Sequence, residues 1–261
     1  MATPKQVLDI NRAAWENYAN GRWSTPVSPE KIEAVRRGEW EAYLIESKPV
    51  PKDWFPELKG ADVLALASGG GQQGPVLAAA GAKVTVFDNS MEQLEKDRLV
   101  AERDHLDLET VQGDMMDLSQ FADESFDLVF HPVSNLFVPD VRPVWREAFR
   151  VLKPGGILLA GFVNPMEYLF DWIKEDEGIL EVAHILPFSS LDVYGEAWLR
   201  EHGEAAEYSH SLETQIGGQL AAGLMLTHLV ESHRKPGTSP KAELFPSYIA
   251  TRAVKPGRKT T

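Results

Sequence analysis

The sequence predicts an α/β fold built on a doubly wound, mostly parallel sheet of seven strands. Two observations carry this prediction. From Ala61 onward, short apolar runs alternate with longer amphipathic stretches, which is the rhythm of strands and helices in a parallel sheet. The first run, VLALA at 63–67, is continuously apolar and is followed by glycines, as expected of a strand buried on both faces.

The regular elements follow from this alternation along the chain. The core occupies 61–163 and resumes at 212–254. Ser211 can cap the last expected helix, because its hydroxyl can accept a hydrogen bond from a free backbone N–H. The expected strands lie at 62–67, 83–87, 108–112, 126–131, 156–163, 226–233 and 246–254, and the expected helices at 73–80, 90–104, 140–152 and 212–223.

Three segments fall outside this core. Residues 1–60 are expected to form an N-terminal helical cap, with one helix at 7–19 and another within the proline-rich stretch 29–47. The irregular stretch 164–211 is long for a plain connection, so we expect an insertion after the fifth strand that covers the substrate. The basic tail 255–261 has little apolar surface and is expected to be frayed.

The composition argues against several classes of partner. Lys and Arg total 26 against 39 Asp and Glu, and this net charge of −13 with scattered basic residues predicts no nucleic-acid partner. No apolar run approaches the roughly 20 residues that span a bilayer, and the N-terminus has no secretory-signal pattern, so we expect a cytoplasmic protein without a membrane partner. The absence of cysteine and the spacing of the histidines predict no metal site. The oligomeric state is not indicated.

A glycine-rich loop follows the first expected strand. In VLALASGGGQQG at 63–74, Gly69, Gly71 and Gly74 fit the pattern G-x-G-x-x-G between a strand and a helix. Glycines let the chain turn sharply and bring its backbone close to a ligand at the positive end of the helix. The loop therefore predicts a cofactor site, with a tight strand–helix turn as the alternative.

An acidic residue ends the second expected strand at the distance typical of a ribose contact. Asp88 lies in KVTVFDNS, 17 residues beyond Gly71, close to the separation of about 20 residues found in dinucleotide sites. Its carboxylate can accept hydrogen bonds from ribose hydroxyls. The alternative is that Asp88 caps the helix beginning near Ser90, although Asn89 could also do so. The loop and the acid together predict an adenosine-bearing cofactor, either NAD or S-adenosylmethionine.

A resemblance to a known family separates these two cofactors. VLALASGGGQQG, VTVFDNS, QGDMMDL, FDLVF and WREAFRVLKPGGILL occur in the order and spacing of the class I, Rossmann-like S-adenosylmethionine-dependent methyltransferases, and they resemble the ubiquinone-biosynthesis-like group most. The likeness covers about residues 60–163 and the terminal strands. It implies an antiparallel last strand and S-adenosylmethionine as cofactor, because dinucleotide dehydrogenases have no counterpart to REAFRVLKPGGILL.

The resemblance also implies roles for individual residues. Gly69 and Gly71 would lie against the methionine part of the cofactor, and Asp88 would hold the ribose. Asp114 and Met115 would flank the adenine, where Met91 could also pack. As alternatives, the two methionines fill the core and Asp114 is a turn residue. Asn89, beside the ribose-binding acid, completes this part of the expected cofactor site.

This chain departs from the family at the start of the glycine motif. Ala65 and Ala67 stand where the family has an acidic residue and a glycine. The amino group of the cofactor must then find another partner, and we expect Ser68, Asn135 or backbone carbonyls of the loop. A protein that binds the cofactor without catalysis is the alternative.

Catalytic candidates follow the fourth expected strand. His131 ends that strand, where a parallel sheet presents side chains to its ligand, and it is the expected general base. A packing role beside Pro132 is equally compatible with the sequence. Asn135 on the same loop is expected to orient the acceptor or cofactor, and His210 is a weaker candidate.

Aromatic side chains of the two covering segments are candidate walls of the site. Trp15 and Tyr18 share one helix face, and the resemblance suggests that such a helix closes over the cofactor, where aromatic rings favour a sulfonium cation. Core packing is the alternative for all of these aromatic residues. The acidic residues at 175–177, 201 and 204 are expected to be solvated. In the insertion, candidates for an acceptor pocket are Tyr168, Phe170, Trp172, Phe188 and Tyr194.

These observations favour one function over two alternatives. The sequence predicts an enzyme that transfers a methyl group from S-adenosylmethionine to oxygen or nitrogen of a small molecule. An NAD(P)-dependent oxidoreductase and a non-catalytic protein that binds S-adenosylmethionine or S-adenosylhomocysteine are the alternatives.

Overall fold

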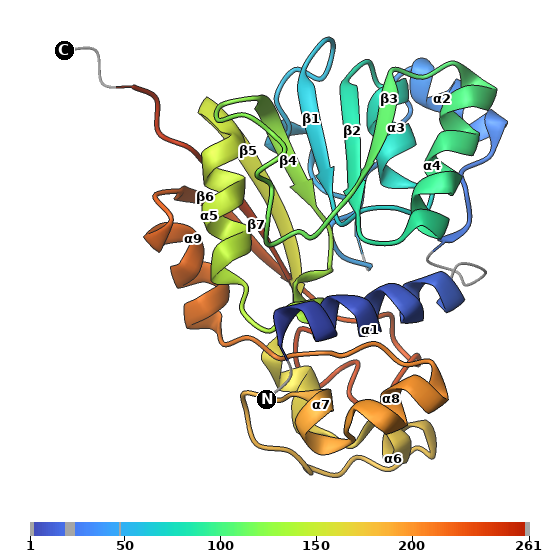
Figure 1. Cartoon of the computed structure of the whole chain (residues 1–261), viewed down its shortest axis with the longest axis vertical. Coiled ribbons are helices and arrows are strands. Elements are labelled where there is room, and N and C mark those ends of the chain that lie inside the picture. Colours follow the sequence, from blue (N-terminus) through green and yellow to red (C-terminus); the bar gives the residue numbers. More distant parts are fainter. Residues whose placement is uncertain (1–2, 19–23, 47, 259–261) are drawn as a thin grey trace.

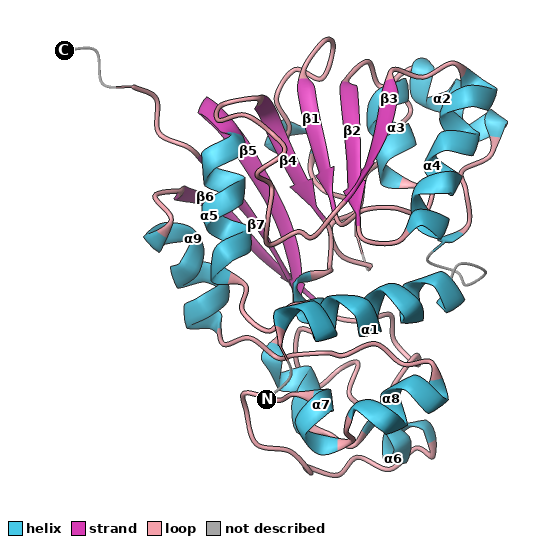
Figure 2. Ribbon diagram, viewed as in Figure 1, coloured by secondary structure: helices cyan, strands magenta, loops and turns pink. Residues whose placement is uncertain are grey.

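A mixed seven-stranded sheet forms the centre of the molecule, as the computed structural model shows for residues 3–18, 24–46 and 48–258. The strand order is β3-β2-β1-β4-β5-β7-β6, with β7 antiparallel to both of its neighbours (Figure 2). The predicted fold class, including its antiparallel last strand, is therefore confirmed. The strands are β1 (Asp62–Leu66), β2 (Lys83–Asp88), β3 (Leu108–Gln112), β4 (Phe126–His131), β5 (Leu152–Val163), β6 (Met225–Ser232) and β7 (Tyr248–Val254).

Helices cover both faces of this sheet because neighbouring residues of a strand point to opposite sides. Val63 and Ala65 of β1 pack toward α3 (Gln73–Ala79), α4 (Met91–Asp104) and the segment that precedes β1. Leu64 and Leu66 pack toward α5 (Arg142–Val151) on the other face. All four side chains are fully buried, which explains why the first apolar run lacks alternation.

The N-terminal end of β5 differs from the expected strand boundary. The strand begins at Leu152, rather than at 156, and the Pro-Gly-Gly segment bulges out of it. Phe126 pairs with Leu152 but Leu128 pairs with Ile157, so the intervening residues loop away from the ladder. Gly155 adopts a φ of +85° in this bulge, which favours glycine there.

The first helix crosses below the carboxyl ends of the parallel strands (Figure 1). Helix α1 (Pro4–Asn17) begins at Thr3, whose side chain and that of Gln6 form a reciprocal capping box. Its partner is α4, because Nε2 of Gln93 donates to the carbonyl of Trp15 at 3.0 Å. Residue 19, where this helix was expected to end, lies outside the described residues.

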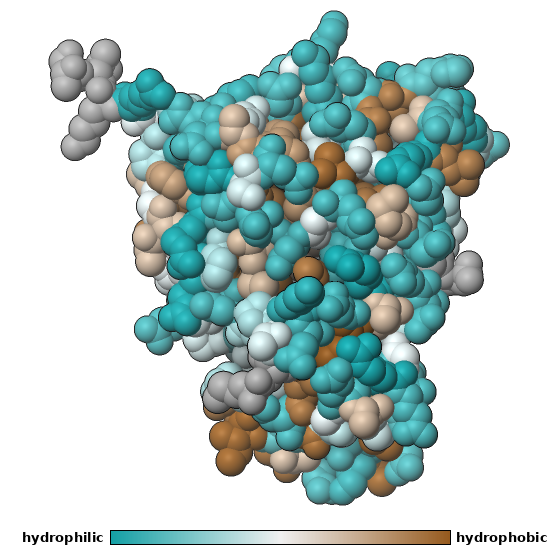
Figure 3. Space-filling view, viewed as in Figure 1, coloured by the Kyte–Doolittle hydropathy of each residue, from teal (hydrophilic) through white to brown (hydrophobic). Residues whose placement is uncertain are grey.

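Residues after β5 build a separate lobe beneath α1 (Figure 1). The expected insertion at 164–211 contains four short helical segments, and residues 233–247 between β6 and β7 join it through contacts such as Asn164 Nδ2 to the Pro246 carbonyl at 2.8 Å. Figure 3 shows apolar surface at the lower end of this lobe, and Ile185 is 90% exposed. The segments are η5 (Pro165–Leu169), α6 (Trp172–Asp176), α7 (Ser190–Val193) and α8 (Glu196–His202).

The remaining elements complete the ends of the chain. The predicted helix at 212–223 is present, and it consists of a π-helical turn, η6 (Glu213–Gly217), followed by α9 (Gly218–Ala221). Lys255 is docked rather than frayed, because its ammonium donates to the Leu152 carbonyl at 2.7 Å, while 259–261 lie outside the described residues. No helix in the described ranges has the length and apolar character to span a bilayer. The other helical segments are α2 (Pro29–Arg36), η3 (Lys52–Trp54) and η4 (Asn135–Phe137).

Candidate functional site

A cavity of about 750 Å³ lies where the carboxyl ends of the strands face α1 and the lobe. Its wall continues from the glycine loop into the interior of the lobe. Carboxyl ends of parallel strands are the usual ligand site of a doubly wound sheet. The cavity therefore combines a part at the strand ends with a chamber within the lobe.

The glycine loop is held from behind by a buried carboxyl group. Oδ2 of Asp97 accepts hydrogen bonds from the backbone N–H of Gly70 at 2.9 Å and of Gly71 at 3.1 Å. Asp97 is fully buried on α4, and burial raises the pKa of its carboxyl to about 8. One signal of this contact is visible in the spacing of the residues, since residue 97 lies on the buried stripe of the helix with Leu94 and Ala101.

The loop itself leaves little room for larger residues. A Cβ added to Gly69 would lie 2.8 Å from Cβ of Gln93 and 3.1 Å from Oδ2 of Asp88. Ala67 lies at φ +48°, in the left-handed region where an L-residue is strained. The departure from the family at this position therefore retains a backbone conformation suited to glycine.

Asp88 combines a structural role with exposure to the cavity. Its Oδ2 accepts the Gly69 N–H and its Oδ1 accepts the Ser90 N–H, both at 3.0 Å. Ser90, and not Asp88, caps α4, because its hydroxyl accepts the Gln93 N–H at 3.3 Å. The Asp88 carboxylate instead holds the turns around it and also lines the cavity. Burial raises its pKa, and the backbone N–H donors act in the opposite direction. These two hydrogen bonds hold the Asp88 side chain in place, so the free lone pairs of its carboxylate have a defined orientation in the cavity wall.

Further predicted residues meet at the same end of the cavity. Asn89, Asp114 and Met115 line it beside Asp88. Oδ1 of Asp114 accepts the Met116 N–H at 2.9 Å, so this residue also forms the predicted turn, and burial raises its pKa. These residues come from the ends of β2 and β3, which pair in parallel register.

Ser68 provides an independent indication that this end takes a polar ligand. Its side chain is 6% exposed and lines the cavity, yet its hydroxyl has no hydrogen-bond partner among the described residues. A buried hydroxyl without a partner is costly. A ligand that presents a polar group to Ser68 would remove this cost, so the residues present fit the amino-acid part of an S-adenosyl cofactor.

Other expected cofactor residues lie elsewhere. Gly71, Met91 and Tyr18 do not line the cavity. Met91 packs against the core on the α3 side of the sheet, and Tyr18 donates to Oε2 of Glu204 at 2.6 Å. Trp15 does line the cavity, and its ring meets that of Tyr18 edge to face.

The expected base and its neighbour are buried away from the cavity. His131 is 0% exposed, and its Nδ1 and Nε2 lie 2.9 Å from the Leu66 carbonyl and 2.5 Å from Oδ1 of Asn135. Nδ2 of Asn135 donates in turn to Oε1 of Gln215 at 3.0 Å. Burial lowers the pKa of His131. Both side chains therefore join β1, η4 and η6 rather than face an acceptor, which corrects the catalytic role expected for them.

His210 is likewise structural. Its Nε2 lies 3.0 Å from the carbonyl oxygens of Asn135 and Val138, and the side chain does not line the cavity. The ring therefore fastens the segment before η6 to the loop after β4. The sequence could not distinguish this role, because both histidines satisfy backbone groups that only the folded chain brings near.

The chamber within the lobe has aromatic walls. Tyr168 stacks on Phe188 with ring centroids 5.2 Å apart, and Tyr194 stacks on Trp198 at 4.8 Å. Trp198 of α8, which sequence reasoning did not select, also lines the cavity. All five predicted aromatic residues line the chamber: Tyr168, Phe170, Trp172, Phe188 and Tyr194.

Paired charges close one side of this chamber. The Lys241 ammonium lies 3.1 Å from Oε2 of Glu167 and 2.6 Å from Oε2 of Glu175, and Arg234 is 3.1 Å from the same oxygen of Glu167. Glu175 lines the cavity and is not the solvated residue expected. The two cations come from residues 233–247, which sequence reasoning did not assign to the site.

Two further carboxylates of the chamber have hydroxyl partners instead. Glu204 accepts from Tyr18, and Oε2 of Glu207 accepts from the Tyr168 hydroxyl at 3.0 Å. Burial raises the pKa of Glu207 to about 7, and the charge of Glu204 adds to this rise. Glu204 was also expected to be solvated, and its place in the cavity wall corrects that expectation.

Known proteins resemble this chain in sequence and in fold. A family profile described as a methyltransferase domain matches residues 64–160. The chain is 50% identical over 250 residues to the uncharacterized methyltransferase YbaJ of Bacillus subtilis, which covers 94% of this chain and 97% of that protein. It is 31% identical over 172 residues to the ubiquinone biosynthesis O-methyltransferase of Pseudomonas syringae pv. tomato, over 62% of this chain and 72% of that protein. A solved S-adenosylmethionine-dependent methyltransferase from Mesorhizobium loti has a similar fold, with a TM-score of 0.62 at 19% identity over 78% of this chain and 94% of that chain.

Proposed function

We propose that this chain, which belongs to the class I S-adenosylmethionine-dependent methyltransferases, transfers a methyl group to oxygen or nitrogen of a small molecule bound in the chamber of the lobe. The observation that carries the proposal is the continuity of one cavity from Ser68 and Asp88 to the aromatic residues of the lobe. A donor at the strand ends and an acceptor in the lobe would then share one space.

The residues that would hold the cofactor line one end of that cavity. Asp88 would accept hydrogen bonds from the ribose hydroxyls, and Asp114 and Met115 would border the adenine. Ser68 would meet the methionine part, in place of the acidic residue that the family has at position 65. When bound, S-adenosylmethionine supplies an electrophilic methyl group on a positively charged sulfur. Trp15 would face that charge with an aromatic ring.

The covering segments supply position and exclusion of water. Methyl transfer needs the attacking atom close to the methyl carbon and in line with the bond that breaks, so orientation is a large part of catalysis. Helix α1 and the lobe both contribute to the cavity wall. A wall on several sides restricts the acceptor to a molecule that fits within the cavity, which supports a small-molecule acceptor.

The two alternative functions, an oxidoreductase and a non-catalytic binding protein, are less well supported. The nicotinamide oxidoreductase rested on the glycine pattern, and membership of the methyltransferase family accounts for that pattern. The non-catalytic alternative rested on Ala65 and Ala67, and Ser68 offers the polar contact whose loss motivated it. Catalysis is therefore the function that the site supports best.

Calorimetry and product detection test this proposal. We expect S-adenosylhomocysteine to bind the protein and NADH not to bind. A metabolite screen with methyl-labelled S-adenosylmethionine should then yield a labelled product. Binding of NADH without S-adenosylhomocysteine would refute the cofactor assignment, and cofactor binding without any methylated product would favour the non-catalytic alternative.

A further inference from the structure

Glu204 and Glu207 differ from Glu167 and Glu175 of the same chamber in having no ion pair with any described residue. Glu167 and Glu175 are both paired with Lys241. Glu204 and Glu207 instead accept only the hydroxyls of Tyr18 and Tyr168, at 2.6 and 3.0 Å. Tyrosine hydroxyls satisfy one oxygen of each carboxylate but do not neutralise its charge. The chamber therefore retains negative charge beside its aromatic walls.

Both carboxylates are half-buried in the cavity wall, and enclosing their charge there without a counter-ion is unfavourable. Carboxylates buried in proteins are usually paired with cations, because hydrogen bonds replace only part of the lost hydration. Arg234 acts on Glu207 only at a distance, and its short contacts are with Glu167. A positively charged ligand group would supply the missing partner, and the aromatic rings of Tyr168 and Trp198 would favour the same charge.

We propose that the acceptor is a primary or secondary amine on an apolar, ring-sized body, and that Glu207 binds its ammonium group and takes the proton that must leave before methyl transfer. This inference rests on the proposed function and selects nitrogen from its two possible attacking atoms. Glu204 contributes a second negative charge to the same group. The stacked pairs Tyr168–Phe188 and Tyr194–Trp198 hold the apolar body.

The reaction balances with these groups and the methyl donor. The ammonium of the acceptor gives a proton to the carboxylate of Glu207, which leaves a neutral amine with a free lone pair. That lone pair forms the new carbon–nitrogen bond while the carbon–sulfur bond of the donor breaks, and the electron pair of the broken bond stays on sulfur. The product is a methylated ammonium ion, and no other reactant is needed.

The electrostatic surroundings of Glu207 suit this proton transfer. Burial raises the pKa of its carboxyl to about 7, with an added rise from Glu204 and a lowering by Tyr168 and Arg234. A base whose pKa lies near the working pH is effective because it is both available and able to accept a proton. Glu167, the other acid near Tyr168, is already paired with Lys241.

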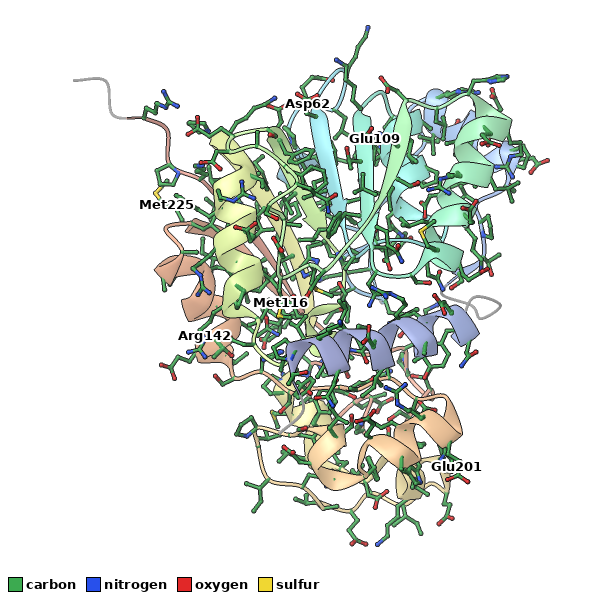
Figure 4. All side chains as sticks on the ribbon, viewed as in Figure 1. Asp62, Glu109, Met116, Arg142, Glu201 and Met225 are labelled. Atoms are coloured by element: carbon green, nitrogen blue, oxygen red, sulfur yellow. The ribbon has the colours of Figure 1, made fainter. Side chains whose placement is uncertain are left out.

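The binding test uses three probes of matched size on protein saturated with S-adenosylhomocysteine. These are 2-phenylethylamine, 2-phenylethanol and 3-phenylpropionate, which differ in charge and are compared by calorimetry near pH ~8. Glu207→Gln is the main variant, because an amide oxygen can still accept from the Tyr168 hydroxyl and the fold should be preserved. Glu201→Gln is the matched control, since this exposed residue at the outer surface of α8 does not line the cavity (Figure 4).

We expect the amine to bind at least about tenfold more tightly than the alcohol or the acid, a difference typical of one hydrogen bond to a charged group. Glu207→Gln should remove that preference, and Glu201→Gln should retain it. Tighter binding of the alcohol or the carboxylate, or an unchanged amine preference in Glu207→Gln, would overturn the inference. Failure to bind S-adenosylhomocysteine or to methylate any acceptor would instead overturn the proposed function.

A kinetic test follows for any amine that the protein methylates. Glu207→Gln should lower kcat/KM by at least about a hundredfold while changing the affinity for S-adenosylhomocysteine by less than about twofold. Equal losses in Glu207→Gln and Glu201→Gln, or methylation of phenols and not of amines, would contradict the role of Glu207.

Discussion

Replacing Asp97 with asparagine tests how the glycine loop is held. The carboxyl group of Asp97 is fully buried, and one oxygen accepts two loop N–H groups while the other has no partner in the described part of the chain. Asparagine has the same shape and keeps an oxygen for both N–H donors. The substitution therefore removes the ionisation of this residue and leaves the loop contacts.

The expected effect is a change in how stability depends on pH. Burial raises the pKa of Asp97 from 3.8 to about 8 in the folded state, so the folded state binds a proton that the unfolded state has released. This contribution is fully present below the unfolded pKa and is lost as the pH rises through the folded pKa. Each pH unit in that window changes the free energy of unfolding by about 1.4 kcal/mol, or about 3 kcal/mol between pH ~5 and pH ~7.

Denaturant unfolding at several pH values measures this difference. The seven tryptophans of the chain provide a fluorescence signal, and the wild type and Asp97→Asn are compared at each pH. Titrating groups that do not interact with Asp97 contribute equally to both curves, so their difference reports Asp97 together with its coupling to Asp88. We expect the wild type to lose stability relative to the variant as the pH rises. Parallel curves would refute the claim that Asp97 is protonated at neutral pH.

Three further substitutions test the same end of the molecule. Asp88→Ala should weaken binding of S-adenosylhomocysteine by about 1.5–3 kcal/mol, or tenfold to a hundredfold, by calorimetry, and an unchanged affinity would remove Asp88 from the site. Ala67→Gly should raise the free energy of unfolding by about 1 kcal/mol because φ is +48°, and a loss of stability would contradict the strain argument. His131→Ala should lower stability by about 2–4 kcal/mol in denaturant unfolding, since the ring is fully buried between hydrogen-bonding partners. A loss of turnover at unchanged stability would restore its catalytic role.

Local patterns were sufficient for the sheet and one end of the cavity. The bounds of β1 to β4 agree with the expected strands to within one residue, because continuous apolar runs and turn residues are properties of neighbouring positions. Ser68 lies two residues beyond β1 and Asp88 is the last residue of β2, so the parallel register of β1 and β2 was enough to bring them together. The aromatic residues of the insertion were also expected, since large rings in an irregular segment must pack somewhere.

The roles of His131 and Glu207 were beyond the reach of such patterns. A histidine at a strand end looks the same whether it faces a ligand or, as here, the Leu66 carbonyl and Asn135. In the sequence Glu207 cannot be distinguished from a surface acid, because its partner Tyr168 is 39 positions away along the chain. Ionisable side chains take their function from the burial and charges around them, and those are set by distant segments.

The sequence by itself determined the doubly wound sheet, the glycine loop and the family to which this chain belongs. Only the tertiary structure decided that Asp97 holds the loop and that Lys241 pairs with Glu167 and Glu175. It also decided that Glu204 and Glu207 line the chamber without an ion pair to any described residue. The physical reason is that strand and turn formation depend on neighbouring residues. Electrostatic pairing depends on distances in space between groups that are far apart in the chain.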